Sequence, residues 1–148
     1  AGAGGDVQHP GAGAQLHRDD PELDRRSAES LFDAIARTPG MTVFVLEEDG
    51  AVAATTYLNV IPNLTRSGSP YAVIENVVVD EARRGAGLGK RVMAGTLEAA
   101  WAAGCYKVMV LTGTRRASTH AFYRACGFSG DEKTAYLAEV ATTCGLVE

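Results

Sequence analysis

The chain has 148 residues, of which 46% are hydrophobic and 22% are charged, with 14 Lys and Arg against 18 Asp and Glu. This length and hydrophobic fraction predict one folded domain and exclude a disordered or fibrous chain. The formal net charge of -4 argues against a surface dedicated to nucleic acid. No apolar run reaches the roughly 18 residues that span a bilayer, so we expect neither a nucleic-acid partner nor a membrane partner.

The N-terminal segment and the cysteines carry no clear functional signal. Residues 1–19 are rich in glycine and lack apolar periodicity, which predicts a flexible or irregular arm before a single domain at residues 20–148. The start of the chain also lacks the profile of a signal peptide. Cys105, Cys126 and Cys144 show no metal-binding spacing, so we expect no metal, thiols in a reducing compartment and a cytoplasmic protein.

The first half of the chain predicts a helix, a hairpin and a buried strand. Asp20, followed by a proline, is a helix-start signal, and an apolar repeat then continues to Pro39. Residues 41–61 form two β-branched and aromatic runs joined at "EEDG", which is typical of a hairpin. After a polar loop at residues 62–70, residues 71–80 ("YAVIENVVVD") are apolar at most positions, as in a central strand.

The second half of the chain alternates helices with short strands. Residues 88–103 repeat apolar side chains at helical spacing and end before Gly104, which is placed as a C-terminal cap. Residues 106–113 predict a strand, and Ser118–Gly127 predicts a second capped helix. Residues 134–140 ("TAYLAEV") predict a last strand. The element order predicts an α/β or α+β domain.

The loop "RRGAGLGKR", residues 83–91, follows the predicted central strand and begins a helix. Free backbone N–H groups at a helix N-terminus and glycines that allow close approach make an anion site, to which Arg84 and Lys90 add charge. A P-loop would require glycine in place of Arg84 and a hydroxyl in place of Arg91, and a dinucleotide fingerprint would require glycine in place of Lys90. Both nucleotide patterns therefore fit poorly.

The pattern that fits is [RQ]-x-x-G-x-[GA], formed by Arg84, Gly87 and Gly89. A second motif, "HAFYRACGF" at residues 120–128, follows with a helix and a strand between the two. With these two motifs the chain resembles the GNAT superfamily of acetyl-CoA-dependent N-acetyltransferases over roughly residues 20–140. The resemblance implies a mixed, mostly antiparallel sheet flanked by helices, with a splayed strand pair that holds CoA.

The resemblance also implies residues for the acetyl-CoA site. Backbone groups of Val77 and Val79 would bind pantetheine and the thioester carbonyl. Arg116 stands where relatives often have a cofactor-binding asparagine, so that contact is either replaced or lost. The pyrophosphate of CoA would lie on the loop formed by Arg84, Gly85, Ala86, Gly87, Leu88, Gly89 and Lys90.

Two catalytic residues are implied by the same resemblance. Tyr123 stands at the family's tyrosine position and would donate a proton to the sulfur of CoA, with a buried structural tyrosine as the alternative. Glu75 is the candidate base, because simple strand alternation puts it on the face of Val77 and Val79 and many relatives have a glutamate there. A solvated or ion-paired Glu75 is the alternative, and His120 or a water molecule could instead carry the amine proton.

The sequence thus predicts acetyl transfer from acetyl-CoA to a primary amine of a small molecule or peptide, by direct attack in a ternary complex. The acidic balance slightly favours cationic acceptors, and the loop at residues 62–70 and the first helix are expected to shape their site. Homodimers are common in proteins of this kind. A non-catalytic CoA-binding sensor or interaction module is the alternative, and a nucleotide-phosphate-binding protein is a third.

Overall fold

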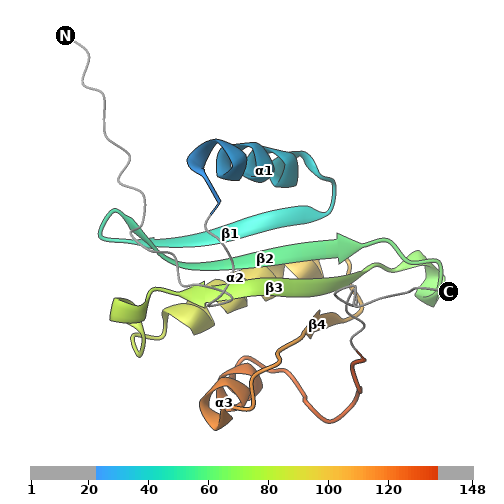
Figure 1. Cartoon of the computed structure of the whole chain (residues 1–148). Helices are drawn as coiled ribbons and strands as arrows, with labels where there is room; N and C mark the ends of the chain where they lie inside the picture. The colour runs from blue at the N-terminus through green and yellow to red at the C-terminus, as the bar shows by residue number, and fades with distance from the viewer. Residues whose placement is uncertain (1–22, 137–148) are drawn as a thin grey trace, which may run out of the picture. The chain divides into compact units, whose positions relative to one another are not determined.

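The computed structural model describes residues 23–136 (Figure 1). The chain separates into two compact units, of which the first ends at Thr114 and the second begins at Arg115. The arm predicted at residues 1–19 lies outside the described residues. So does most of the last predicted strand, and its described part, residues 134–136, forms no strand.

The first unit contains a four-stranded sheet in the order β1-β2-β3-β4 (Figure 1). The β1/β2 and β2/β3 pairs are antiparallel and the β3/β4 pair is parallel, which confirms the mixed, mostly antiparallel sheet. Asp49 and Gly50 have φ of 54° and 75°. Two positive φ angles in a two-residue loop match the twist of a hairpin, and they confirm the predicted one. The strands are β1 (Met41–Glu48), β2 (Ala51–Ile61), β3 (Tyr71–Val79) and β4 (Val108–Val110).

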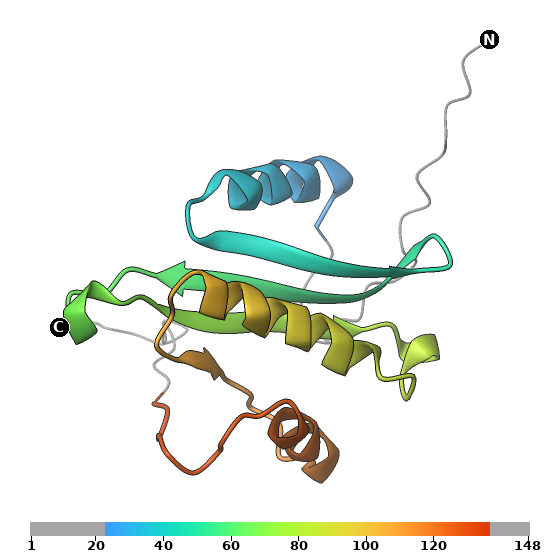
Figure 2. The same ribbon diagram turned by 180° about the vertical axis from the view of Figure 1, so that it is seen from behind.

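Helix α2 (Leu88–Ala102) covers one face of the sheet, behind β2 and β3 in Figure 1 and in front of them in Figure 2. Its buried side chains repeat every three or four residues, which places them on one stripe of the helix. The only polar side chains buried here among the described residues are Thr56 of β2 and Thr96 of α2, whose hydroxyls hydrogen-bond to each other. The α2-side core includes Ala54, Leu58, Ala72, Ile74, Leu88, Val92, Met93 and Ala100.

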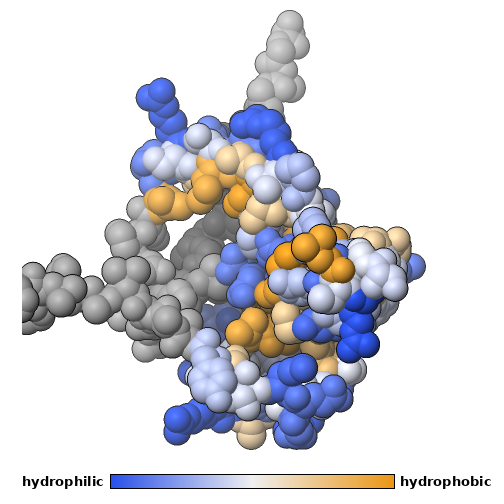
Figure 3. Space-filling view, turned by 90° about the vertical axis from the view of Figure 1, so that its right-hand side faces the viewer, coloured by the Kyte–Doolittle hydropathy of each residue, from blue (hydrophilic) through white to orange (hydrophobic). Residues whose placement is uncertain are grey.

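Helix α1 (Arg25–Arg37) begins later than the sequence signal indicated. Asp24, rather than Asp20, is the N-cap, because its carboxylate accepts a hydrogen bond from the Ser27 N–H at 3.0 Å and another from the Ser27 hydroxyl. These bonds favour the ionised carboxylate and lower its pKa. The helix packs against β1, and the space-filling view of Figure 3 shows hydrophobic atoms along its underside, toward the sheet.

Two short 3₁₀ helices complete the first unit, Arg66–Gly68 in the loop before β3 and Glu81–Arg83 before the glycine loop. Strand β4 is shorter than the predicted strand 106–113, because pairing to β3 ends at Val110. The second unit contains α3 (Ala117–Ala125). Its N-cap is Arg116 rather than Ser118, since the Arg116 carbonyl accepts the N–H groups of the first turn.

Candidate active site

Strand β3 changes its environment halfway along its length. Its first half pairs in parallel with β4, from Ala72 opposite Val108 to Ile74 opposite Val110. Beyond Ile74, residues 75–79 continue beside β2, but no described strand pairs with their other edge. Parallel strands that separate in this way leave backbone N–H and C=O groups available to a ligand.

A β-bulge lies where β3 loses its partner. Glu75 is opposite Tyr57, but Val78 is opposite Thr55, so β3 has one more residue than β2 in this interval. Asn76 has a φ of 51°, the left-handed conformation that asparagine tolerates better than most residues. A bulge of this kind re-aims the side chains on either side of it.

The bulge corrects the expectation that Glu75 shares a face with Val79. Residues opposite each other in adjacent strands lie on the same face. Glu75 is opposite Tyr57 and Val79 is opposite Ala54, and these two β2 residues are three apart, which places them on opposite faces. Val79 thus faces α2, whereas the exposed Glu75 faces the α1 side of the sheet.

Residues 75–79 of β3, here called the open half of the strand, direct their backbone groups as a pantetheine site requires. The Asp80 N–H donates to the Ala53 carbonyl of β2 at 2.9 Å. Because successive strand residues direct their backbone groups to opposite edges, Val79 and Val77 direct theirs away from β2, toward the open edge. The predicted backbone contacts are therefore on the edge that β4 leaves open, where the Val79 carbonyl accepts a hydrogen bond from Arg84 Nε at 3.4 Å.

The glycine loop presents a second set of free donors. Gly85 and Gly87 have φ of 89° and 79°, which turns the chain so that α2 begins at Leu88. The first helical bond is from the Arg91 N–H to the Gly87 carbonyl at 3.1 Å. No described backbone carbonyl accepts a hydrogen bond from the N–H groups of residues 85–90. These donors and the helix dipole form an anion site.

Arginines next to the loop tie it to the rest of the first unit. The Arg83 guanidinium donates to the Glu48 carbonyl at 2.9 Å and lies 3.6 Å from the Asp49 carboxylate, so it pins the start of the loop to the β1–β2 turn. Sequence reasoning missed this role, although the acidic "EED" turn was a signal for it. Arg84 is more exposed, with its guanidinium 3.5 Å from the Glu81 carboxylate.

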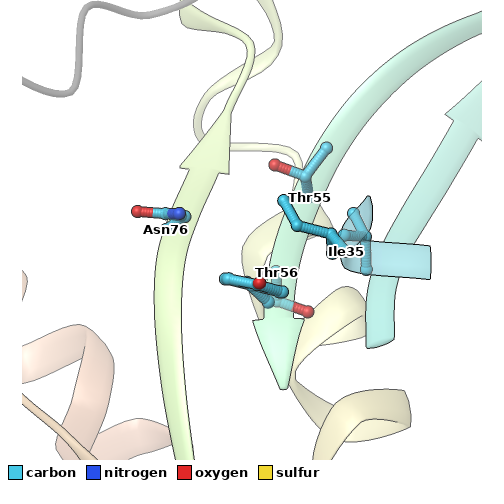
Figure 4. Close-up of a pocket in the computed structure, with 6 residues that line it drawn as sticks. Ile35, Thr55, Thr56 and Asn76 are labelled. Carbon is cyan, nitrogen blue, oxygen red and sulfur yellow. The ribbon is translucent and has the colours of Figure 1, made fainter. Parts of the chain in front are cut away.

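A cavity of about 100 Å³ opens beside the bulge, on the α1 side of the sheet (Figure 4). Asn76 of β3 lies on one side of it, and Thr55 and Thr56 of β2 lie on the other side together with Ile35 of α1. Glu75 is on this same face, because it is opposite Tyr57 and Tyr57 lines the cavity. The full lining is Ile35, Val43, Thr55, Thr56, Tyr57 and Asn76.

The remaining predicted residues belong to the second unit. Tyr123 lies on α3, half-buried, with its ring edge-on to Phe122 at 5.2 Å and to Phe128 at 6.0 Å between centroids. Arg116 precedes the same helix and His120 is on it. The predicted residues thus fall into two sets. Glu75, the valines and the glycine loop are in the first unit, and Tyr123, His120 and Arg116 are in the second.

Other kinds of site find no support in the described residues. Cys105 is buried, and burial raises the pKa of its thiol, which keeps it protonated and a poor nucleophile. Residues 23–136 contain no group of three or more His, Cys, Asp and Glu side chains that could hold a metal ion. No helix within the same range has the length and apolar character needed to cross a bilayer.

Comparisons with known proteins agree with this geometry. Residues 12–128 match the model of the acetyltransferase (GNAT) family. Glucosamine 6-phosphate N-acetyltransferase of Trypanosoma brucei brucei is 35% identical over 114 residues, which cover 76% of each chain. A solved structure from Agrobacterium tumefaciens str. C58, provisionally assigned as an acetyltransferase, is 46% identical with a TM-score of 0.78 and covers 84% of this chain and 86% of its own.

The crystal structure of glucosamine-6-phosphate N-acetyltransferase from Arabidopsis thaliana also superposes, with a TM-score of 0.71 and 26% identity over 82% of each chain. The open edge of β3, the free donors of the glycine loop and these relatives lead to one conclusion. The chain belongs to the acetyltransferase (GNAT) family and is an N-acetyltransferase.

Proposed function

We propose that this protein transfers the acetyl group of acetyl-CoA to the primary amine of a small molecule, by direct attack in a ternary complex. The observation that carries the proposal is the continuity of two donor sets. The backbone groups of Val77 and Val79 at the open edge of β3 are followed, after a single turn, by the free N–H groups of residues 85–90. A pantetheine arm and a pyrophosphate require these two kinds of site in this order.

The α1 face of the sheet is the proposed acceptor side. Glu75 is exposed on this face, next to the cavity lined by Tyr57 and Asn76. An exposed carboxylate attracts an ammonium group and can take its proton, either directly or through water. The acetyl group would then be at the edge of β3 while the amine approaches from the α1 side.

The proposed reaction balances without a covalent enzyme intermediate. The neutral amine nitrogen attacks the thioester carbonyl, a C–N bond forms, and the C–S bond breaks as the oxyanion collapses. The attacking nitrogen, which enters as the neutral amine, loses one proton to Glu75, and the departing thiolate takes a proton from the Tyr123 hydroxyl; solvent then takes the proton from Glu75 and returns one to Tyr123. The raised pKa of the buried Cys105 thiol supports direct attack, because this residue is a poor acetyl carrier.

The acceptor to test first comes from the relatives. The Trypanosoma and Arabidopsis proteins are named for glucosamine 6-phosphate, and a primary amine on a small sugar suits a small cavity that mixes hydroxyl, amide and aliphatic groups. Peptide amines are the second class to test. A cavity of about 100 Å³ has room for roughly three water molecules, so it would hold one end of such an acceptor and not the whole molecule.

Steady-state kinetics with acetyl-CoA and an amine panel test the proposal. Intersecting initial-velocity lines are expected, whereas parallel lines with an isolable acetyl-enzyme would refute direct attack. Calorimetry with CoA, ATP and NAD runs beside the kinetics. Tight CoA binding without turnover of any amine would favour a CoA-binding sensor or interaction module, and tighter binding of ATP or NAD would overturn the assignment of the loop.

The proton-donor role has its own test. Replacing Tyr123 with Phe keeps the ring that contacts Phe122 and Phe128 but removes the hydroxyl. The turnover number should fall roughly 100-fold, with little change in the KM of acetyl-CoA, because proton transfer from a positioned side chain typically contributes about that factor. Full turnover in Tyr123→Phe would assign the proton to another group and leave Tyr123 as a packing residue.

A further inference from the structure

The α1 face of β3 carries a row of side chains that leads away from the bulge. Tyr71, Val73 and Glu75 alternate along the strand, and their partners on β2 are Ile61, Asn59 and Tyr57 in regular register. No bulge interrupts this stretch, so the three side chains lie on one face. Glu75 is at the catalytic end of the row, and Tyr71 is at the other end.

Two cations gather at the Tyr71 end. The Lys107 ammonium lies 5.2 Å from the centroid of the Tyr71 ring and 5.5 Å from that of the Tyr106 ring. The Arg66 guanidinium lies 5.6 Å from the centroid of the same Tyr106 ring. Within residues 23–136, no carboxylate forms a salt bridge with either cation. Both cations thus lie against the Tyr106 ring, and no described carboxylate pairs with either of them.

The loop that carries Arg66 is held in a strained conformation. Arg66 and Ser67 have φ of 55° and 57°, positive values that are uncommon outside glycine. The Asn63 side-chain amide holds the loop by donating to the Thr65 carbonyl at 3.0 Å and to the Ser69 carbonyl at 3.3 Å. Backbone strain of this kind costs about 1–3 kcal/mol per residue and is concentrated at functional sites. In this loop conformation the Arg66 guanidinium lies over the Tyr106 ring.

The Lys107 ammonium lies on the side of the sheet where Glu75 meets the cavity, because it lies against the Tyr71 ring, and Arg66 lies against the neighbouring Tyr106 ring. Lys107 immediately precedes β4, and its carbonyl accepts the Ala72 N–H at 3.0 Å, so its backbone is fixed beside the start of β3. Tyr71 and Glu75 are four residues apart, which is about 13 Å of extended strand. An acceptor that reaches both Glu75 and Lys107 has to span this distance less the reach of the two side chains.

We propose that Arg66 and Lys107 bind the phosphate of a phosphorylated amine whose nitrogen lies at Glu75. The inference rests on the proposed function, and it restricts the acceptor to amines that carry an anionic group remote from the nitrogen. Two cations without a described carboxylate match a phosphate monoester, which carries nearly two negative charges at neutral pH. A basic end and an acidic end on one face also fix the direction in which such an acceptor binds.

The test compares glucosamine with glucosamine 6-phosphate on the whole protein. The wild type should show a KM at least about tenfold lower for the phosphorylated amine, because charge-assisted hydrogen bonds to phosphate are strong. Lys107→Met and Arg66→Ala should each remove most of this preference while the turnover number and the KM of acetyl-CoA stay nearly unchanged. Arg26→Ala removes an exposed cation of α1 and serves as the matched control. It should keep the full preference.

A readout that needs no turnover separates this inference from the proposed function. Calorimetry of glucosamine 6-phosphate with the CoA-bound protein should show binding that Lys107→Met weakens and Arg26→Ala does not. Binding with this pattern but without acetylation would refute the proposed acetylation of this amine and would support the phosphate site. Equal KM values for the two amines, or a preference unchanged in both Lys107→Met and Arg66→Ala, would overturn the phosphate site and leave the acetyltransferase.

Discussion

The two halves of β3 belong to one strand but differ in their strand pairing, their regularity and their burial. Residues 72–74 pair on both edges, and Ala72 and Ile74 are fully buried under α2. Residues 75–79 pair on one edge only, contain a bulge and expose Glu75 and Asn76. The first half supplies a rigid base, and the second half leaves its backbone and its carboxylate available. A strand can therefore combine stability and function when the two are separated along its length.

The open half also lies between the proposed acetyl-CoA side and the proposed acceptor side of the site. Its edge is the proposed path of the pantetheine arm, and its α1 face carries Glu75 and the cavity. The bulge at Asn76 separates the two, because it turns Glu75 away from the face of Val79. Donor and acceptor would thus approach from different sides of the strand.

The largest effect is expected from Glu75→Gln in the open half. Loss of the base should reduce kcat/KM for the amine by roughly 100-fold to 10,000-fold, the range that a positioned general base contributes. The midpoint of thermal unfolding should change little, since Glu75 is exposed and makes no described salt bridge. A loss of less than about threefold would mean that His120 or solvent carries the proton.

Ile74→Ala tests the paired half. Ile74 is fully buried beneath α2, so the substitution leaves a cavity and should lower the free energy of unfolding by about 2–5 kcal/mol. Val78→Ala, in the half-buried open part, is the matched comparison and should cost about 1 kcal/mol. Urea titration measures both. Equal losses would contradict the division of β3 into a structural half and a functional half.

The bulge itself is tested at Asn76. Asn76→Val places a β-branched residue at a φ of 51° and should destabilise the fold by about 1–3 kcal/mol. Asn76→Gly accepts the same backbone conformation and should keep the stability close to that of the wild type. If the bulge sets the position of Glu75, turnover should fall in Asn76→Val. Wild-type turnover and stability in both variants would show that the bulge does not matter.

Asp24→Ala gives the smallest effect, at a site remote from β3. The folded-state pKa of Asp24 is lowered, chiefly by its hydrogen bond with the Ser27 side chain. A lowered pKa means that this stabilisation is complete above the ordinary value of 3.8 and is lost as the pH falls through the folded value. Unfolding curves of wild type and Asp24→Ala should therefore differ slightly at neutral pH and converge in strong acid. A difference that persists unchanged there would exclude the carboxylate cap as its source.

Local patterns predicted much of the first unit. "EEDG" placed the hairpin, the apolar run placed β3, and the helical repeat before Gly104 placed α2. These succeeded because hydrophobic periodicity and turn residues act over a few neighbours. The helix caps predicted at Asp20 and Ser118 were wrong, because the N-caps of α1 and α3 are Asp24 and Arg116. Asp24 has Ser27 within reach, and Arg116 accepts the first-turn N–H groups of α3.

Some features of the site likewise follow from the sequence alone, and others depend on the tertiary structure. The sequence by itself determined the family, through two motifs, and the donors of the glycine loop, because a strand followed by glycines and a helix produces free N–H groups locally. Only the tertiary structure decided where β4 leaves β3, which face Glu75 takes and which cations gather at Tyr71. Strand register and strand separation depend on partners that are distant in sequence, and one extra residue in a strand is invisible until its partner is known.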